Sequence, residues 1–171
     1  MKKVFFGLII IIFCTLLLVG CQNKATLSLD NEYSNSFYKI KYPKQWTEKN
    51  LNKMQDTVLF KINADSDSEN FGIVVEKLNM TADKYLNGHI SQMKTFFDQF
   101  KLINSSDVKI DGQKAVKVVY WGKVNNKALK YMQLVTVKAG NGYIFNYTAR
   151  KDEYQQYIDT VNAMIDSFSF N

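Results

Sequence analysis

Cysteine, proline, histidine and arginine are all scarce in this chain, and these scarcities exclude several classes of function. Its 171 residues include two cysteines, one proline and one histidine, and Arg150 is the only arginine. The single histidine, His89, excludes a metal site built from several imidazoles. A single arginine argues against recognition of nucleic acid, because phosphates and base edges are commonly bound by the guanidinium fork. We therefore expect no nucleic-acid partner.

The longest apolar run lies at the N-terminus and predicts a secretory signal. Lys2 and Lys3 precede VFFGLIIIIFCTLLLVG, which has the charged start and the apolar centre of a signal peptide. The run leads into Leu-Val-Gly-Cys at residues 18–21, which resembles the lipobox of bacterial lipoproteins. This resemblance implies cleavage before Cys21 and attachment of lipid to the Cys21 thiol. An uncleaved membrane anchor is the competing interpretation of the same segment.

Cleavage and lipidation at Cys21 would leave the folded domain without a free thiol. Cys14 lies within the signal and Cys21 would carry the lipid. Neither a disulfide nor a cysteine-based catalytic or metal site is then expected. Two acyl chains hold a protein on a membrane much more firmly than one. We expect a protein anchored by lipid on Cys21 to the extracytoplasmic face of a bacterial cell membrane.

One domain is expected after the signal. Residues 1–20 are expected to be removed, residues 21–35 to form a lipidated N-terminus and a polar tether, and residues 36–171 to fold. Alternating apolar and polar side chains predict strands, and the turn residues between residues 108 and 150 predict an antiparallel meander. The strands before the meander are expected at residues 37–42, 57–63 and 71–79.

Two segments have the apolar periodicity of amphipathic helices. The first is residues 82–100 and the second is residues 152–168. The first has an apolar stripe formed by Leu86, Ile90, Met93, Phe97 and Phe100, and the second has one formed by Tyr154, Tyr157, Ile158, Val161, Ile165 and Phe168. Strands, helix, strands and helix predict an α+β domain, in which amphipathic helices pack on the faces of a central antiparallel sheet.

Several stretches resemble the PsbP-like family. FYKIKYPKQW at residues 37–46 is similar to the opening strand of that family and to the tyrosine-proline-tryptophan turn that follows it. The other similar stretches are NFGIVVEKL, TADKYLNGHI, INSSDVKIDGQKAVKVVYW and GYIFNYTARKDEYQQYIDTVNAMIDSFSF, so the resemblance spans residues 36–170. It implies an α/β/α sandwich and a role in assembling a complex or binding a partner protein. No ligand-binding residue of the family can be matched to this chain, and no cofactor is implied.

An acidic loop is the best candidate for a metal site. Asp65, Asp67 and Glu69 occupy alternate positions, and Glu76 lies eleven residues after Asp65, as in a calcium-binding loop. Two features weaken the match, because Asn70 stands where such a loop needs glycine and Glu76 falls within a strand pattern. A solvated hairpin loop is the competing interpretation.

The sequence favours a binding module over an enzyme. No Gly-x-Ser-x-Gly motif occurs, and His89 lies at the edge of an apolar helix stripe, where a half-buried structural histidine is the better interpretation. The predicted function is a membrane-anchored, non-enzymatic module that binds a protein or assembles a complex. Two alternatives stay open: binding of a small ligand or envelope polymer in a concave pocket, and hydrolysis by paired carboxylates. No catalytic residue is predicted, and the binding residues stay undefined.

Overall fold

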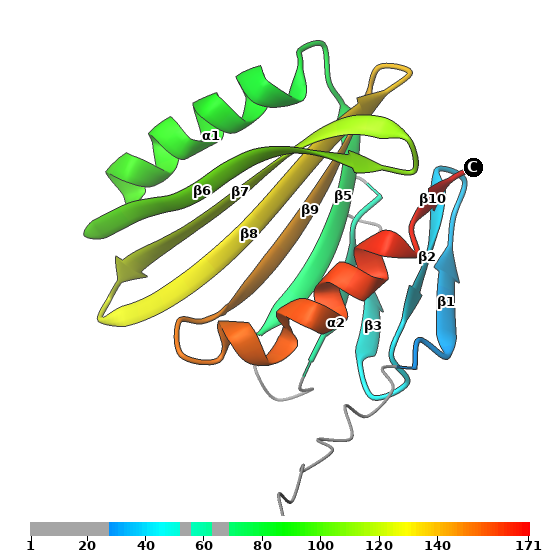
Figure 1. Cartoon of the computed structure of the whole chain (residues 1–171), viewed down its shortest axis with the longest axis horizontal. Coiled ribbons are helices and arrows are strands. Elements are labelled where there is room, and N and C mark those ends of the chain that lie inside the picture. Colours follow the sequence, from blue (N-terminus) through cyan, green and yellow to red (C-terminus); the bar gives the residue numbers. More distant parts are fainter. Residues whose placement is uncertain (1–27, 52–55, 63–68) are drawn as a thin grey trace, which may run out of the picture.

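The computed structural model describes residues 28–51, 56–62 and 69–171, which form two antiparallel sheets and two helices (Figure 1). The small sheet has the order β1-β2-β10 and the large sheet has the order β3-β4-β5-β9-β8-β7-β6. The strands of the small sheet are β1 (Asn31–Ser34), β2 (Tyr38–Tyr42) and β10 (Ser169–Phe170). The strands of the large sheet are β3 (Thr47–Asn50), β4 (Val58–Lys61), β5 (Asn70–Lys77), β6 (Gln99–Ile110), β7 (Gln113–Val124), β8 (Lys127–Lys138) and β9 (Asn141–Arg150). The helices are α1 (Ala82–Phe96) and α2 (Tyr154–Asp166).

Each face of the large sheet has its own hydrophobic core. On one face, α2 and the small sheet cover a cluster that includes the fully buried Tyr38, Phe145 and Val161. On the opposite face, α1 buries Leu86 against residues such as Val135. Figure 1 shows α1 along one side of the curved large sheet, with α2 and the small sheet on its other side. The α+β fold expected from the sequence, with helices packed on the faces of an antiparallel sheet, is confirmed.

Two-residue turns connect the strands of the predicted meander. All of their residues have positive φ values, which match the right-handed twist of the flanking strands. The turns are Asp111 (43°) and Gly112 (77°), Asn125 (48°) and Asn126 (63°), and Ala139 (50°) and Gly140 (74°). Asp, Asn and Gly tolerate this left-handed conformation well. The turn residues therefore fix the pairing of β6 with β7, of β7 with β8 and of β8 with β9.

The aromatic segment at residues 37–46 has the predicted alternation. Tyr38 and Ile40 on β2 are completely buried, and Trp46 beyond the proline is 4% exposed. Lys39 and Lys41 lie on the opposite, exposed face of the strand. The apolar residues of this segment thus serve the core, as the alternation indicated.

The first helix is shorter than its apolar stripe predicted. It ends at Phe96, and Phe97 has an extended conformation with its amide donating to the Met93 carbonyl. β6 then starts at Gln99, so that Phe100 belongs to a strand. Phe97 and Phe100 nevertheless face the same core as the helix. The spacing of Phe97 and Phe100 continues the helical period by coincidence, and this explains why the helix was wrongly predicted to extend to residue 100.

The short strands at the two ends of the domain were missed. The polar tether was expected to continue through residue 35, whereas Asn31–Ser34 forms β1 and pairs with β2. Tyr33 is its only buried residue, and such a short run has too little alternation to indicate a strand. The predicted signal, Cys21 and the first part of the tether lie outside the described residues. Within the described part of the chain, neither helix has the length and apolar character needed to cross a membrane.

Candidate functional site

Helix α1 divides one face of the large sheet into separate surfaces. Thr81 caps the helix by accepting a hydrogen bond from the Lys84 amide (3.3 Å), which satisfies one of the free N–H groups of the first turn. Leu86 and Ile90 are its buried residues and fix it to the sheet. The helix packs mainly on β6, β7 and β8. It therefore leaves hollows at its start and along its flank.

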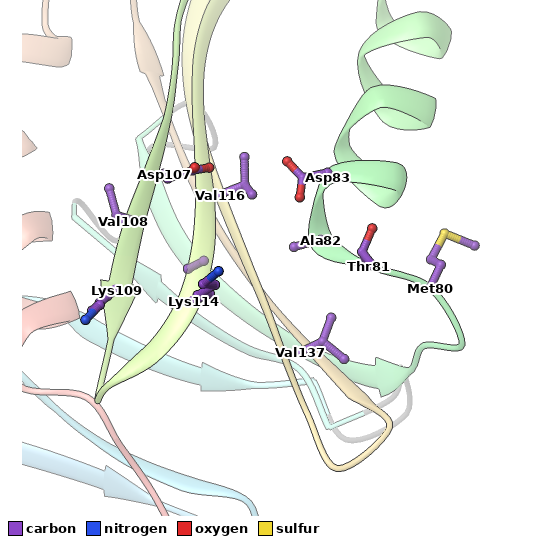
Figure 2. Close-up of a pocket in the computed structure, with 11 residues that line it drawn as sticks. Met80, Thr81, Ala82, Asp83, Asp107, Val108, Lys109, Lys114, Val116 and Val137 are labelled. Carbon is purple, nitrogen blue, oxygen red and sulfur yellow. The ribbon is translucent and has the colours of Figure 1, made fainter.

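The first hollow lies at the start of α1, against the β6–β7 hairpin (Figure 2), and has a volume of about 610 Å³. We call it the helix-start hollow. Ala82, Val116 and Val137 give it apolar walls. Asp83 on α1 and Asp107 on β6 point into the same space from opposite sides (Figure 2). These two are the acidic residues of its lining, so a carboxylate-based hydrolase that acted in this hollow would have to use them.

The second hollow lies on the flank of α1 and has a volume of about 310 Å³. We call it the flank hollow. Its lining combines residues of one helix and three strands that are far apart in the sequence. They include His89, Met93 and Phe96 of α1, Tyr120 of β7, Tyr131 and Gln133 of β8, and Asn146 and Thr148 of β9. A mixed wall of aromatic rings, amides and hydroxyl groups results.

Hydrogen bonds fix two pairs of side chains in the flank hollow. Gln133 lies opposite Asn146 in the β8–β9 register, and its Nε2 donates to the Asn146 Oδ1 at 2.9 Å. Gln133 is only 4% exposed, and no described residue hydrogen-bonds to its Oε1. The Nε2 of His89 lies 3.3 Å from the Tyr120 hydroxyl. A buried amide with an unsatisfied oxygen is uncommon in folded proteins.

The flank hollow carries no formal charge at neutral pH. Burial lowers the pKa of His89 below its usual 6.5, which keeps the imidazole neutral. Burial also raises the pKa values of the Tyr120 and Tyr131 hydroxyls, so both stay protonated. Among the described residues that line the hollow there is no Asp, Glu, Lys or Arg. The half-buried position predicted for His89 is confirmed, and it also makes His89 part of this surface.

The residues of the predicted calcium loop are only partly described. Asp65 and Asp67 lie outside the described residues. Glu69 is buried at 3% exposure, and its Oε1 lies 3.4 Å from the Nε of Arg150. Arg150 also forms an ion pair with Glu153, which precedes α2. The Glu69 carboxylate is thus held on the α2 side of the sheet.

The fourth residue of that predicted loop lies elsewhere. Glu76 is close to the Tyr85 hydroxyl of α1, and burial together with this carboxylate raises the pKa of Tyr85 to about 12. Glu69 and Glu76 therefore contact opposite faces of the sheet and are not brought together. Among the described residues, no group of three or more His, Cys, Asp or Glu side chains could hold a metal ion.

The outer edge of β6 forms a third surface. No strand in the described part of the chain pairs with this edge. A register shift between Leu102 and Asn104 makes Ile103 a bulged residue. Leu102 is 42% exposed and Ile103 is 47% exposed, and we call these two residues the edge patch. The opposite edge of the sheet, β3, has four residues, all exposed.

Apart from His89, sequence reasoning identified none of the residues of the three surfaces as candidates for a functional site. The sequence does mark Gln133 as unusual, because it is a polar residue inside the largely apolar stretch YMQLVTVK. Asn146 becomes its partner only through the β8–β9 register, which the sequence does not specify residue by residue. Leu102 and Ile103 were not expected to belong to a strand, because α1 and β6 follow one another almost without a break.

Comparison with known proteins places the chain in a family. The family model described as PsbP-like protein matches residues 19–170. Comparison with curated proteins finds no match. The solution structure of cyanobacterial PsbP (CyanoP) from Synechocystis sp. PCC 6803 is 21% identical in sequence, with a TM-score of 0.63 and coverage of 90% of this chain and 99% of that chain.

Two further structures have the same fold. Protein PA94 of Pseudomonas aeruginosa, described as a putative regulator of unknown function, is 16% identical, with a TM-score of 0.59 and coverage of 80% and 94% of the two chains. LpqN of Mycobacterium tuberculosis, described as involved in cell envelope biogenesis, is 14% identical, with a TM-score of 0.57 and coverage of 82% and 91%. At these identities the three structures establish a shared fold, and the family model covers nearly the whole chain. The chain therefore belongs to the PsbP-like protein family.

Proposed function

We propose that this protein is a lipid-anchored, non-enzymatic binding module on the extracytoplasmic face of a bacterial cell membrane, and that it binds a partner protein along β6. The observation that carries the proposal is the apolar edge patch on a long strand with an open edge. β6 has twelve residues, and Leu102 and Ile103 are its fourth and fifth residues. Membership of the PsbP-like family, with the binding role that the sequence resemblance implies, supports a non-enzymatic module.

The open edge of β6 determines the kind of partner. In an antiparallel strand with one neighbour, alternate backbone N–H and C=O groups point away from that neighbour. Only another extended polypeptide can complete such a ladder, which is the usual basis of strand addition in peptide recognition. The edge patch would then hold apolar side chains of the added strand. We expect a partner that contributes an extended segment with apolar residues.

The two edges of the large sheet differ in how they are protected. Natural sheets discourage unwanted pairing with short edge strands and with charged residues. β3 follows this rule, since it is short and carries Glu48 and Lys49. β6 is much longer and has no charged residue between Lys101 and Asp107, a stretch that reads LINSS, and its one protective feature there is the bulge at Ile103. This difference supports β6 as the edge that receives a partner.

Cross-linking from the edge patch tests the partner. A photoreactive amino acid at position 103 is expected to cross-link one defined envelope protein in intact cells, whereas the same probe at the exposed Gln155 of α2 is not. The cross-linked protein is then purified and its affinity for the domain is measured. We expect Ile103→Asp to weaken binding by about tenfold or more, because a carboxylate would be desolvated against apolar side chains. Equal affinity of the wild type and the variant would contradict binding along β6.

The lipid anchor has its own test. Cys21→Ala removes the thiol to which lipid is expected to attach, so the variant is expected to leave the membrane fraction or to accumulate as an unprocessed precursor. Cys14→Ala is the matched control, because Cys14 lies within the expected signal and should be cleaved off with it. Membrane fractionation and the mass of the mature chain measure both variants. A Cys21→Ala protein that is processed and membrane-bound like the wild type would rule out the anchor.

A further inference from the structure

We propose that the flank hollow binds a neutral saccharide unit. The hollow is separate from the edge patch, so the inference does not rest on a protein partner at β6. A sugar ring combines an apolar face of C–H groups with hydroxyl groups that both donate and accept hydrogen bonds. The flank hollow offers matching groups, because the exposed ring of Phe96 stands near the amides of Gln133 and Asn146.

The buried amide of Gln133 points to a ligand that donates hydrogen bonds. Its Nε2 is used by Asn146, while its Oε1 lacks a partner among the described residues. Leaving a buried acceptor unsatisfied is unfavourable, and an apolar residue of similar shape would avoid that loss. A hydroxyl or amide N–H of a bound ligand would complete the hydrogen bonding of Gln133.

The absence of charge in the lining selects against ionic ligands. A charged ligand would lose its hydration on entering the hollow and would find no opposite charge among the described lining residues. This argument excludes lipid phosphates and acidic sugars as preferred ligands. In the whole chain, by contrast, 22% of the residues are charged. Neutral hydroxyl-rich molecules fit the hollow better than either ionic class.

The size of the hollow and its surroundings suggest a unit within a longer chain. Its volume of about 310 Å³ is at the lower end of the range for ligand sites, which is about 300–1,000 Å³. His89 also lines an adjacent hollow of about 380 Å³, whose other lining residues are Met80, Lys84, Tyr85, Gly88 and Gln92, so that this neighbouring space, unlike the flank hollow, includes one positive charge. The path along the helix therefore continues beyond one sugar unit.

Gly88 leaves the helix surface of the adjacent hollow free of a side chain. A glycine inside a helix is less favourable than alanine because it has more backbone freedom to lose. A Cβ atom at Gly88 would meet no other atom within 4 Å, so no described part of the chain excludes a side chain at this position. The space left at Gly88 is sufficient for a ligand to approach the helix backbone beside His89.

Binding of neutral trisaccharides to the purified domain tests the inference. We expect chitotriose or maltotriose to shift the amide NMR signals of Gln133, Asn146 and His89, and to give a dissociation constant by titration. Gln133→Leu should weaken the binding at least tenfold, and Gln155→Leu on α2 should leave it unchanged. Gly88→Ala should raise the melting temperature and still weaken the binding. Trigalacturonate, which is charged, should not bind.

Four results would overturn the inference. In the first, neither neutral trisaccharide shifts the signals of the flank hollow. In the second, the Gln133→Leu variant binds as tightly as the Gln155→Leu variant, and in the third, trigalacturonate binds as well as chitotriose. The acetylated and amidated tripeptide of alanine is the remaining comparison. If it occupies the hollow more tightly than either sugar, the ligand is a peptide and the saccharide assignment is wrong. Circular dichroism of each variant confirms that loss of binding is not loss of the fold.

Discussion

Replacing Gly122 with alanine is expected to destabilise the domain by roughly 3 kcal/mol, at the upper end of the usual cost of overpacking a core. A Cβ atom at this position would lie 2.4 Å from Cγ of Phe97 and within 2.6 Å of two further atoms of that ring. The ring cannot move away easily, because Phe97 also contacts Tyr120 and Tyr131. Urea unfolding of the purified domain measures the change.

Gly88→Ala is the matched control for this substitution. The same change on α1 meets no atom within 4 Å and should stabilise the domain by about 0.5–1 kcal/mol. Pairing Gly122→Ala with Phe97→Leu should cost less than the sum of the two single changes, because the smaller side chain relieves the clash. If Gly122→Ala and Gly88→Ala had the same effect, the packing of Phe97 on Gly122 would be wrong.

Removing the ring of Phe168 is expected to cost about 3–5 kcal/mol, as is typical for a buried phenylalanine replaced by alanine. Phe168 follows α2 and is 4% exposed. Its ring centroid lies 5.2 Å from that of Tyr38 and 5.0 Å from that of Phe145, so it joins the small sheet to the large sheet. Phe168→Ala should therefore both lower the free energy of unfolding and increase hydrogen exchange at the amides of β2.

Phe96→Ala provides the control for the lost aromatic ring. Phe96 is 61% exposed at the end of α1, so its removal should change the free energy of unfolding by no more than about 0.5 kcal/mol. The combination of a large loss for Phe168→Ala with rapid exchange in β2 indicates that this ring attaches the small sheet. A loss of similar size without any change in β2 would contradict that role.

Much of the fold could be predicted because local rules and the global fold agree. In the meander, turn pairs such as Asp111–Gly112 stand between strands whose side chains alternate. Both signals are local and strong. The end of α1 could not be predicted, since Phe97 and Phe100 face the helix core from non-helical positions. The spacing of apolar residues indicates which side chains face the core. Here a helix and the extended segment after it both direct side chains to the same core, so the spacing does not show where the helix ends.

The candidate sites were harder to predict because they depend on distant parts of the chain. His89, Gln133 and Asn146 belong to a helix and two different strands. Only the register that sets Gln133 opposite Asn146, together with the placement of α1, brings them to one hollow. No single stretch of sequence carries that information. The expected lipid attachment at Cys21 differs in this respect. It is predicted from the adjacent residues 18–21 alone, and its test needs no structure.

The small sheet also depends on contacts between segments that are far apart in the sequence. β2 comprises Tyr38–Tyr42, whereas its partner β10 consists of Ser169 and Phe170. The amide of Asn171 itself donates to the Phe37 carbonyl. The hairpins of the large sheet can form as soon as their own residues have been made, because their contacts are close in sequence. β2, by contrast, gains its second neighbour only by closing a loop that spans most of the domain, so we expect the small sheet to be completed late in folding.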